Sequence, residues 1–158
     1  MIVTLADSEV AVATMIALAR RASSRGHNVQ DAQMGKQDPM EIDIDGMVAE
    51  IAFGKQFNYY PEFVVGLKSG GPDFVTRTGE TVDVKATRHQ NGRLLATTKK
   101  NLDPCDIYVL AIILSCRKVD LCGYIKKEDF FTPQNLMDLG YGPTYAVNQE
   151  KLQRFKER

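Results

Sequence analysis

Two acidic residues and a lysine near the middle of the chain have the types and spacing that metal-assisted phosphate chemistry requires. Apolar and polar residues alternate over residues 81–87, which predicts a half-buried strand with Val82 and Val84 on one face. Asp83 and Lys85 then share the opposite, polar face. An acid-x-lysine triplet is common by itself, so its meaning depends on what lies beside it.

A short loop before this strand predicts its neighbour. Residues 77–79, Arg-Thr-Gly, fit a three-residue hairpin loop with the glycine in the left-handed position. Pairing Thr76 with Glu80 across the loop sets Asp73 opposite Asp83, with Cβ atoms about 5 Å apart. Such carboxylates repel each other unless a cation lies between them, and Mg²⁺ or Mn²⁺ meets that need. The alternative is an ordinary surface hairpin whose acids face water.

Glu50 is the third candidate acid. It lies within residues 48–53, whose other members are all apolar, in a helix predicted to begin near Asp43 or Asp45 and to end at Phe57. A glutamate is rarely placed in such a stretch without a partner, which favours a functional role. The alternative is that Glu50 occupies the solvent-facing stripe of an amphipathic helix.

The segment between residues 85 and 100 is basic and contains no acid. Its cationic side chains and its one histidine are Lys85, Arg88, His89, Arg93, Lys99 and Lys100. Beside a metal-binding pair of acids, all of these except Lys85 are predicted to bind nucleic-acid phosphates. The alternative is an ordinary solvated loop.

The overall composition excludes several classes of protein. The chain has 158 residues with 20 basic and 20 acidic side chains, so it is not a polybasic nucleic-acid coat protein. Its three cysteines include no Cys-x-x-Cys pair, which argues against a disulfide framework or a zinc site. Residues 107–114, the longest apolar run, are about half of a membrane span, and Asp7 and Glu9 interrupt the region where a signal peptide is apolar. We expect a soluble, unprocessed protein.

The remaining pattern predicts the elements that position these residues. Residues 7–25 are expected to form an amphipathic helix with a basic end, and residues 127–139 to be mostly helical. Residues 106–115 form a near-continuous branched apolar run, which is typical of a central strand buried on both faces. Residues 119–125 predict a further strand. This order of helices and strands predicts a mixed α/β domain.

The helix with its internal glutamate, the hairpin acids and the lysine together resemble the PD-(D/E)xK nuclease superfamily. The resemblance covers about residues 41–125 and rests on Pro72-Asp73 at the start of one strand and on Asp83-x-Lys85 in the next. It implies a restriction-endonuclease-like core, in which a mixed sheet of four to five strands is flanked by helices. It also implies that residues 1–158 are one nuclease-like domain and that the helix over residues 7–25 is extra to its core.

The resemblance also implies roles for single residues. Asp73 and Asp83 are expected to bind Mg²⁺, with Mn²⁺ as a substitute, and Glu50 to bind it directly or through water. Lys85 is expected to contact the attacking water and the phosphate.

The expected activity is that of a Mg²⁺-dependent deoxyribonuclease with DNA as its partner, as a monomer or a homodimer. Further similarity to small phage-encoded members, at residues 87–94 and 123–125, implies a cytoplasmic protein in a bacterial host. The alternatives are a catalytically inert DNA-binding module of the same fold and a metal-dependent phosphoesterase that acts on small molecules.

Overall fold

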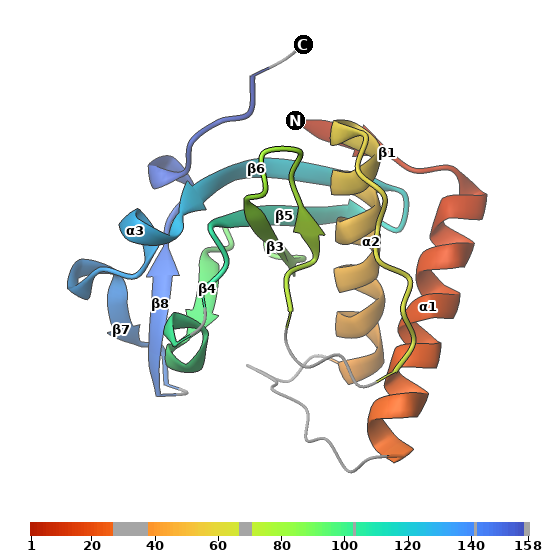
Figure 1. Ribbon diagram of the computed structural model, residues 1–158, viewed down its shortest axis with the longest axis horizontal. Coiled ribbons are helices and arrows are strands. Elements are labelled where there is room, and N and C mark those ends of the chain that lie inside the picture. The colour runs from red at the N-terminus through yellow and green to blue at the C-terminus, as the bar shows by residue number, and fades with distance from the viewer. Residues whose placement is uncertain (27–37, 67–70, 103, 141, 157–158) are drawn as a thin grey trace.

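The computed structural model describes residues 1–26, 38–66, 71–102, 104–140 and 142–156 and shows two sheets with two long helices (Figure 1). In chain order, with η for a 3-10 helix, the elements are β1 (Ile2–Thr4), α1 (Asp7–Gly26), α2 (Pro39–Phe57), β2 (Phe74–Val75), β3 (Thr81–Thr87), β4 (Leu94–Thr97), η1 (Thr98–Asn101), β5 (Ile107–Ser115), β6 (Lys118–Lys126), α3 (Lys127–Phe130), η2 (Pro133–Asn135), β7 (Leu136–Asp138), β8 (Pro143–Val147) and η3 (Gln149–Lys151). The predicted α/β class and the helix over residues 7–25 are confirmed.

The larger sheet has five strands, is curled and is mixed, as predicted. Its strand order is β1-β6-β5-β3-β2; β3 and β5 run parallel, and the other neighbouring pairs are antiparallel. The middle strand β5 is buried from Tyr108 to Ile113, in keeping with its apolar run. The edge strand β1 was not predicted, because three residues are too few to show an alternating pattern.

Different layers cover the two faces of this sheet (Figure 1). On one face α1 and α2 lie side by side, and Val82 and Val84 of β3 belong to the core that α2 completes. The three-stranded sheet, of order β4-β8-β7, belongs to a second core that includes Tyr108 of β5. Because successive strand residues point to opposite faces, Asp83 and Lys85 project from β3 away from the helix layer.

The start of α2 differs from the prediction. The helix begins at Pro39, one turn before Asp43 and Asp45, because Asp38 caps it by accepting the Met40 N–H at 2.9 Å. It ends at Phe57, as predicted. Its acidic first turns are thereby placed on the surface, where they meet arginines from other elements.

The segment after β6 is the largest departure from the predicted elements. Residues 127–139, expected to be mostly helical, form the four-residue α3, then η2 and β7. Pro133 disfavours helical backbone at Thr132, so the helix stops after one turn, and the Asn135 side chain donates to the carbonyls of Asp129 and Phe130.

Among the described residues, no helix has the length and apolar character needed to cross a membrane.

Candidate metal and phosphate site

The β2–β3 hairpin has the register that the loop predicted. The paired residues are Phe74 with Val82 and Val75 with Thr81. This register sets Asp73 opposite Asp83. The Thr76 N–H donates to the Glu80 carbonyl at 2.8 Å, and Gly79 has the expected left-handed φ of 88°. Residues with a Cβ atom rarely adopt that φ, so the glycine helps to fix the register and, with it, the placement of the two acids.

Asp83 is buried and meets two lysines. It is 4% exposed; Lys85 Nζ lies 2.5 Å from its Oδ1, and Lys100 Nζ lies 3.3 Å from its Oδ2. The Lys100 contact is an ion pair without hydrogen-bond geometry, and Oδ2 accepts no hydrogen bond from any described residue. Buried polar atoms are normally hydrogen-bonded, so this oxygen, whose described contact is the ion pair with Lys100, has the capacity to accept a further ligand.

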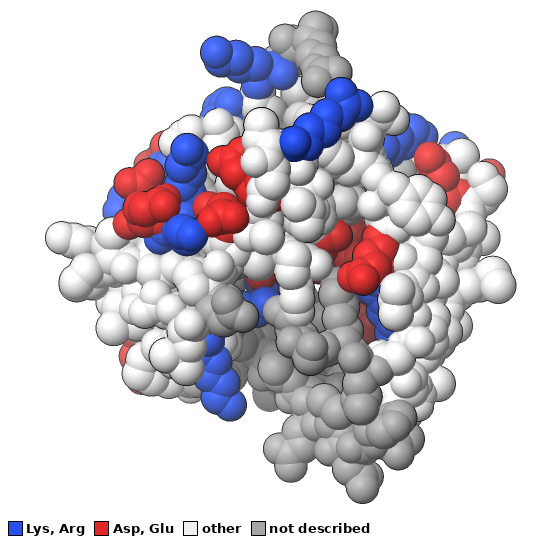
Figure 2. All heavy atoms as spheres, in the orientation of Figure 1, with Lys and Arg blue, Asp and Glu red and all other residues white. Residues whose placement is uncertain are grey.

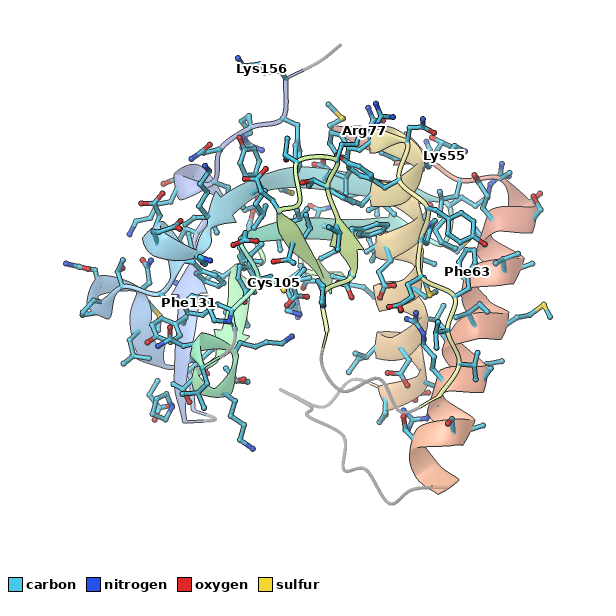
Figure 3. All side chains as sticks on the ribbon, viewed as in Figure 1. Lys55, Phe63, Arg77, Cys105, Phe131 and Lys156 are labelled. Atoms are coloured by element: carbon cyan, nitrogen blue, oxygen red, sulfur yellow. The ribbon has the colours of Figure 1, made fainter. Side chains whose placement is uncertain are left out.

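The lysines determine the charge state of this cluster. Burial acts to raise the pKa of Asp83, but the charges of Lys85 and Lys100 outweigh it and lower the pKa below its usual range. Burial acts to lower the pKa of Lys100, but the charge of Asp83 outweighs it, so the pKa is raised. Cys105, labelled in Figure 3, lies beside them, and burial together with the Asp83 charge raises the pKa of its thiol. The cysteine is therefore a neutral neighbour.

Asp73 is held against the strand that carries Asp83. Its Oδ2 accepts the Val84 N–H at 2.8 Å, and its own N–H donates to the Val82 carbonyl at 2.9 Å. The side chain is half-buried. The backbone of β3 thus fixes the position of this carboxylate.

Asp73 and Asp83 are oxygen ligands of the kind that hard divalent cations prefer, whereas Glu50, the predicted third ligand, does not form a group of three with them. Mg²⁺ is usually bound by one or two protein carboxylates, with water and substrate phosphate as its other ligands. Asp73 and Asp83 are such a pair of carboxylates, and Oδ2 of Asp83 accepts no hydrogen bond from any described residue. Within the described part of the chain, no three or more His, Cys, Asp or Glu side chains form a group that could hold a metal ion. Glu50 is therefore not part of a three-carboxylate cluster.

Glu50 is instead tied to the N-terminal helix. It is 9% exposed, so the solvent-facing alternative is wrong, and Arg20 of α1 lies 3.4 Å from its Oε2. Arg20 also donates to the carbonyls of Glu62 and Val64. The sequence analysis missed this role of Arg20, because Arg20 and Glu50 are 30 residues apart and no local pattern pairs them.

The residues predicted to bind phosphate lie in different surroundings. Arg88 forms ion pairs with Asp45 at 2.6 Å and with Glu41 at 3.1 Å, and Lys100 lies on Asp83. The others, His89, Arg93 and Lys99, are exposed. Figure 2 shows that basic and acidic side chains are interspersed on the face in view. Three of the five predicted residues thus lie on the surface, and within the described part of the chain none of these three forms an ion pair with an acidic side chain.

Comparisons with known proteins identify no family for this chain. No family model matches it, and no curated protein or solved structure matches it significantly.

Proposed function

We propose that this protein is a metal-dependent nuclease that hydrolyses DNA phosphodiester bonds. The observation that carries the proposal is the Asp73–Asp83 pair on adjacent strands, in which a buried oxygen of Asp83 lacks a hydrogen bond from any described residue. Lys85 lies on the same face of β3. Paired carboxylates with an adjacent lysine suit the binding of a cation and the stabilisation of charge on a phosphate.

The residues of the cluster have separate tasks in this proposal. Asp73 and Asp83 hold Mg²⁺, for which Mn²⁺ substitutes. The bound ion supplies a water of lowered pKa and offsets charge on the scissile phosphate. Lys85 orients the attacking water and offsets the negative charge that develops on the phosphate. Glu50, held by Arg20, acts from outside the metal's own ligands.

The arrangement of elements supports a restriction-endonuclease-like core. α2 precedes the β2–β3 hairpin, and the hairpin belongs to a mixed sheet, as the resemblance implies. In this sheet β5 lies parallel to β3. In the proposal the core binds DNA phosphates through His89, Arg93 and Lys99. Arg88 contributes little, because two acids of α2 already neutralise it. In the proposal the protein acts in the cytoplasm of a phage-infected bacterium, and a homodimer would allow it to cut both strands of a duplex.

The decisive experiment uses several forms of DNA and several metal conditions. Supercoiled, linear, single-stranded and branched DNA are incubated with Mg²⁺, Mn²⁺, Ca²⁺ or EDTA. We expect cleavage in Mg²⁺ and Mn²⁺, none in EDTA, and binding without cleavage in Ca²⁺, which activates water less well. Arg77→Ala is the control variant for substitutions at Asp73 and Asp83. Arg77 lies in the exposed loop of the same hairpin (Figure 3), so its loss should leave cleavage unchanged. Absence of nicking in both Mg²⁺ and Mn²⁺ would overturn the proposal.

A catalytically inert DNA-binding module is the second candidate function. The observation that favours it is that Lys85 and Lys100 both form ion pairs with Asp83 and so offset its charge. Such a module would bind DNA equally well in EDTA and in Mg²⁺ and would nick no form of it. The same experiment therefore separates the two candidates.

A further inference from the structure

The outer face of α1 is apolar along most of its length. Its exposed members between the first and last turns are Ala11, Val12, Met15, Leu18 and Ala22. Met15, at the centre, is 69% exposed, and residues 10–19 carry no charge. The inner face, with Ala13 and Ala17, is buried. A helix that is apolar on both faces is normally covered on both.

The side chains on this outer face are arranged symmetrically about Met15. Outward from Met15, equivalent positions hold Val12 and Leu18, Ala11 and Ala19, and Ser8 and Ala22. If two α1 helices pack antiparallel about a twofold axis at Met15, Val12 lies opposite Ala19 of the second copy, and Leu18 opposite Ala11. Larger side chains then meet smaller ones, which permits close packing of the helices.

The helix dipoles of α1 favour the same arrangement. The charged side chains near its two ends already have partners within the chain: Asp7 pairs with Arg117, Glu9 with Lys55, Arg20 with Glu50 and Arg21 with Asp43. These ion pairs therefore do not set the orientation of a second copy. Antiparallel packing opposes the two helix dipoles favourably, whereas parallel packing would place like ends together.

We propose that α1 is the contact surface for a second copy of this chain, with the two helices antiparallel about Met15. Asp83 projects from the opposite face of the sheet, so the pairing leaves the candidate site uncovered. The proposal rests on the surface of α1 and does not require nuclease activity.

Sedimentation equilibrium tests the proposal over protein concentrations from about 1 to about 200 µM, a range that covers weak to moderate dimers. We expect a concentration-dependent dimer that Met15→Glu weakens at least about a hundredfold, because it juxtaposes like charges at the centre of the contact. Met15→Gln, which adds no charge, should weaken the dimer less. The matched control is Leu102→Glu, since Leu102 is 87% exposed and lies outside α1. A wild-type protein that stays monomeric, or a dimer that resists Met15→Glu, would overturn the proposal.

Crosslinking with a short bismaleimide tests the orientation. In a Cys116→Ser background, which removes the exposed native thiol, Met15→Cys should crosslink to itself. Ser8→Cys should crosslink only when mixed with Ala22→Cys, because antiparallel packing separates the two copies of residue 8 by about 21 Å along the axis. Efficient self-crosslinking of Ser8→Cys would instead show parallel helices and contradict the proposed arrangement.

Discussion

Two aspartates near β3 differ in how completely their neighbours satisfy them. Asp106 accepts the N–H and hydroxyl of Thr81 at 2.9 and 2.8 Å on one oxygen and the Lys127 ammonium at 2.6 Å on the other. Asp83 is more deeply buried, yet one of its oxygens accepts no hydrogen bond from any described residue. The more buried carboxylate is therefore the less satisfied one, and it has the capacity for another ligand.

The partners of the two carboxylates differ in kind as well. Asp106 joins the beginning of β3 to the beginning of β5 and to Lys127 after β6, so it fixes strands that are distant in sequence. The ion pairs of Asp83 come from lysine side chains that are about one-third exposed and can turn toward solvent. We infer that Asp106 serves the fold and that Asp83 serves a ligand. The predictions below test this distinction.

The largest expected effect is that of Asp83→Asn on metal binding and cleavage. The amide has the size of the carboxylate but lacks the charge that holds a cation, so cleavage should be abolished and Mn²⁺ affinity should fall by at least about a hundredfold, more than the loss of an outer-shell partner costs. Calorimetric titration with Mn²⁺ measures the second effect. Asp106→Asn is the control and should keep Mn²⁺ affinity. Equal Mn²⁺ affinity in Asp83→Asn and the wild type would contradict the assignment of the site.

Lys85→Met should separate catalysis from metal binding. The lysine offsets charge that develops only in the transition state, so its loss should lower kcat by about 10²–10³. It should not weaken Mn²⁺ binding, because removal of the ammonium 2.5 Å from Asp83 relieves repulsion of the cation. Single-turnover cleavage and calorimetry measure the two quantities. A loss of Mn²⁺ affinity comparable to that of Asp83→Asn would show that Lys85 serves the metal site itself.

Asp106→Asn should have its effect on stability, with a characteristic dependence on pH. Hydrogen bonds from Lys127 and Thr81 hold the pKa of Asp106 well below its usual range. Because the folded pKa lies below the unfolded one, this stabilisation is present at neutral pH and is lost as the pH falls below about 4. Urea titrations should therefore show a lower midpoint for the variant at pH 7 and a smaller difference from the wild type in acid. A pH-independent difference would show that the charge of Asp106 is not what stabilises the strands.

The sequence predicted those parts of the site that local geometry determines. The register of Asp73 with Asp83 follows from a three-residue loop and Gly79, and the burial of β5 follows from its composition. The one-turn α3 was predictable in principle, since Pro133 is visible in the sequence.

The missed contacts join residues that are distant in the sequence. Arg20 with Glu50 and Arg88 with Asp45 are 30 and 43 residues apart, and only the packing of α1 and β3 against α2 brings them together. Lys100 was predicted to lie in a DNA-binding loop, but η1 carries it back to Asp83. The basic composition of residues 85–100 thus indicated that these side chains pair with negative groups, but not which groups those are.

The smallest expected effect concerns Lys100, whose ammonium lies 3.3 Å from Oδ2 of Asp83. An incoming cation must displace or repel this ammonium, so Lys100→Met should raise Mn²⁺ affinity. A charge about 4 Å away in a well-solvated setting contributes about 1 kcal/mol, which corresponds to roughly a fivefold change. Lys99→Met is the matched control, because Lys99 precedes Lys100 in η1 and is exposed. Isothermal titration of both variants with Mn²⁺ measures the difference. If Lys100→Met binds Mn²⁺ more weakly than Lys99→Met does, Lys100 supports the metal site instead of competing with the cation. The ion pair of Asp83 with Lys100 would then be structural, as the ion pair of Asp106 with Lys127 is, and the contrast between the two aspartates would fail.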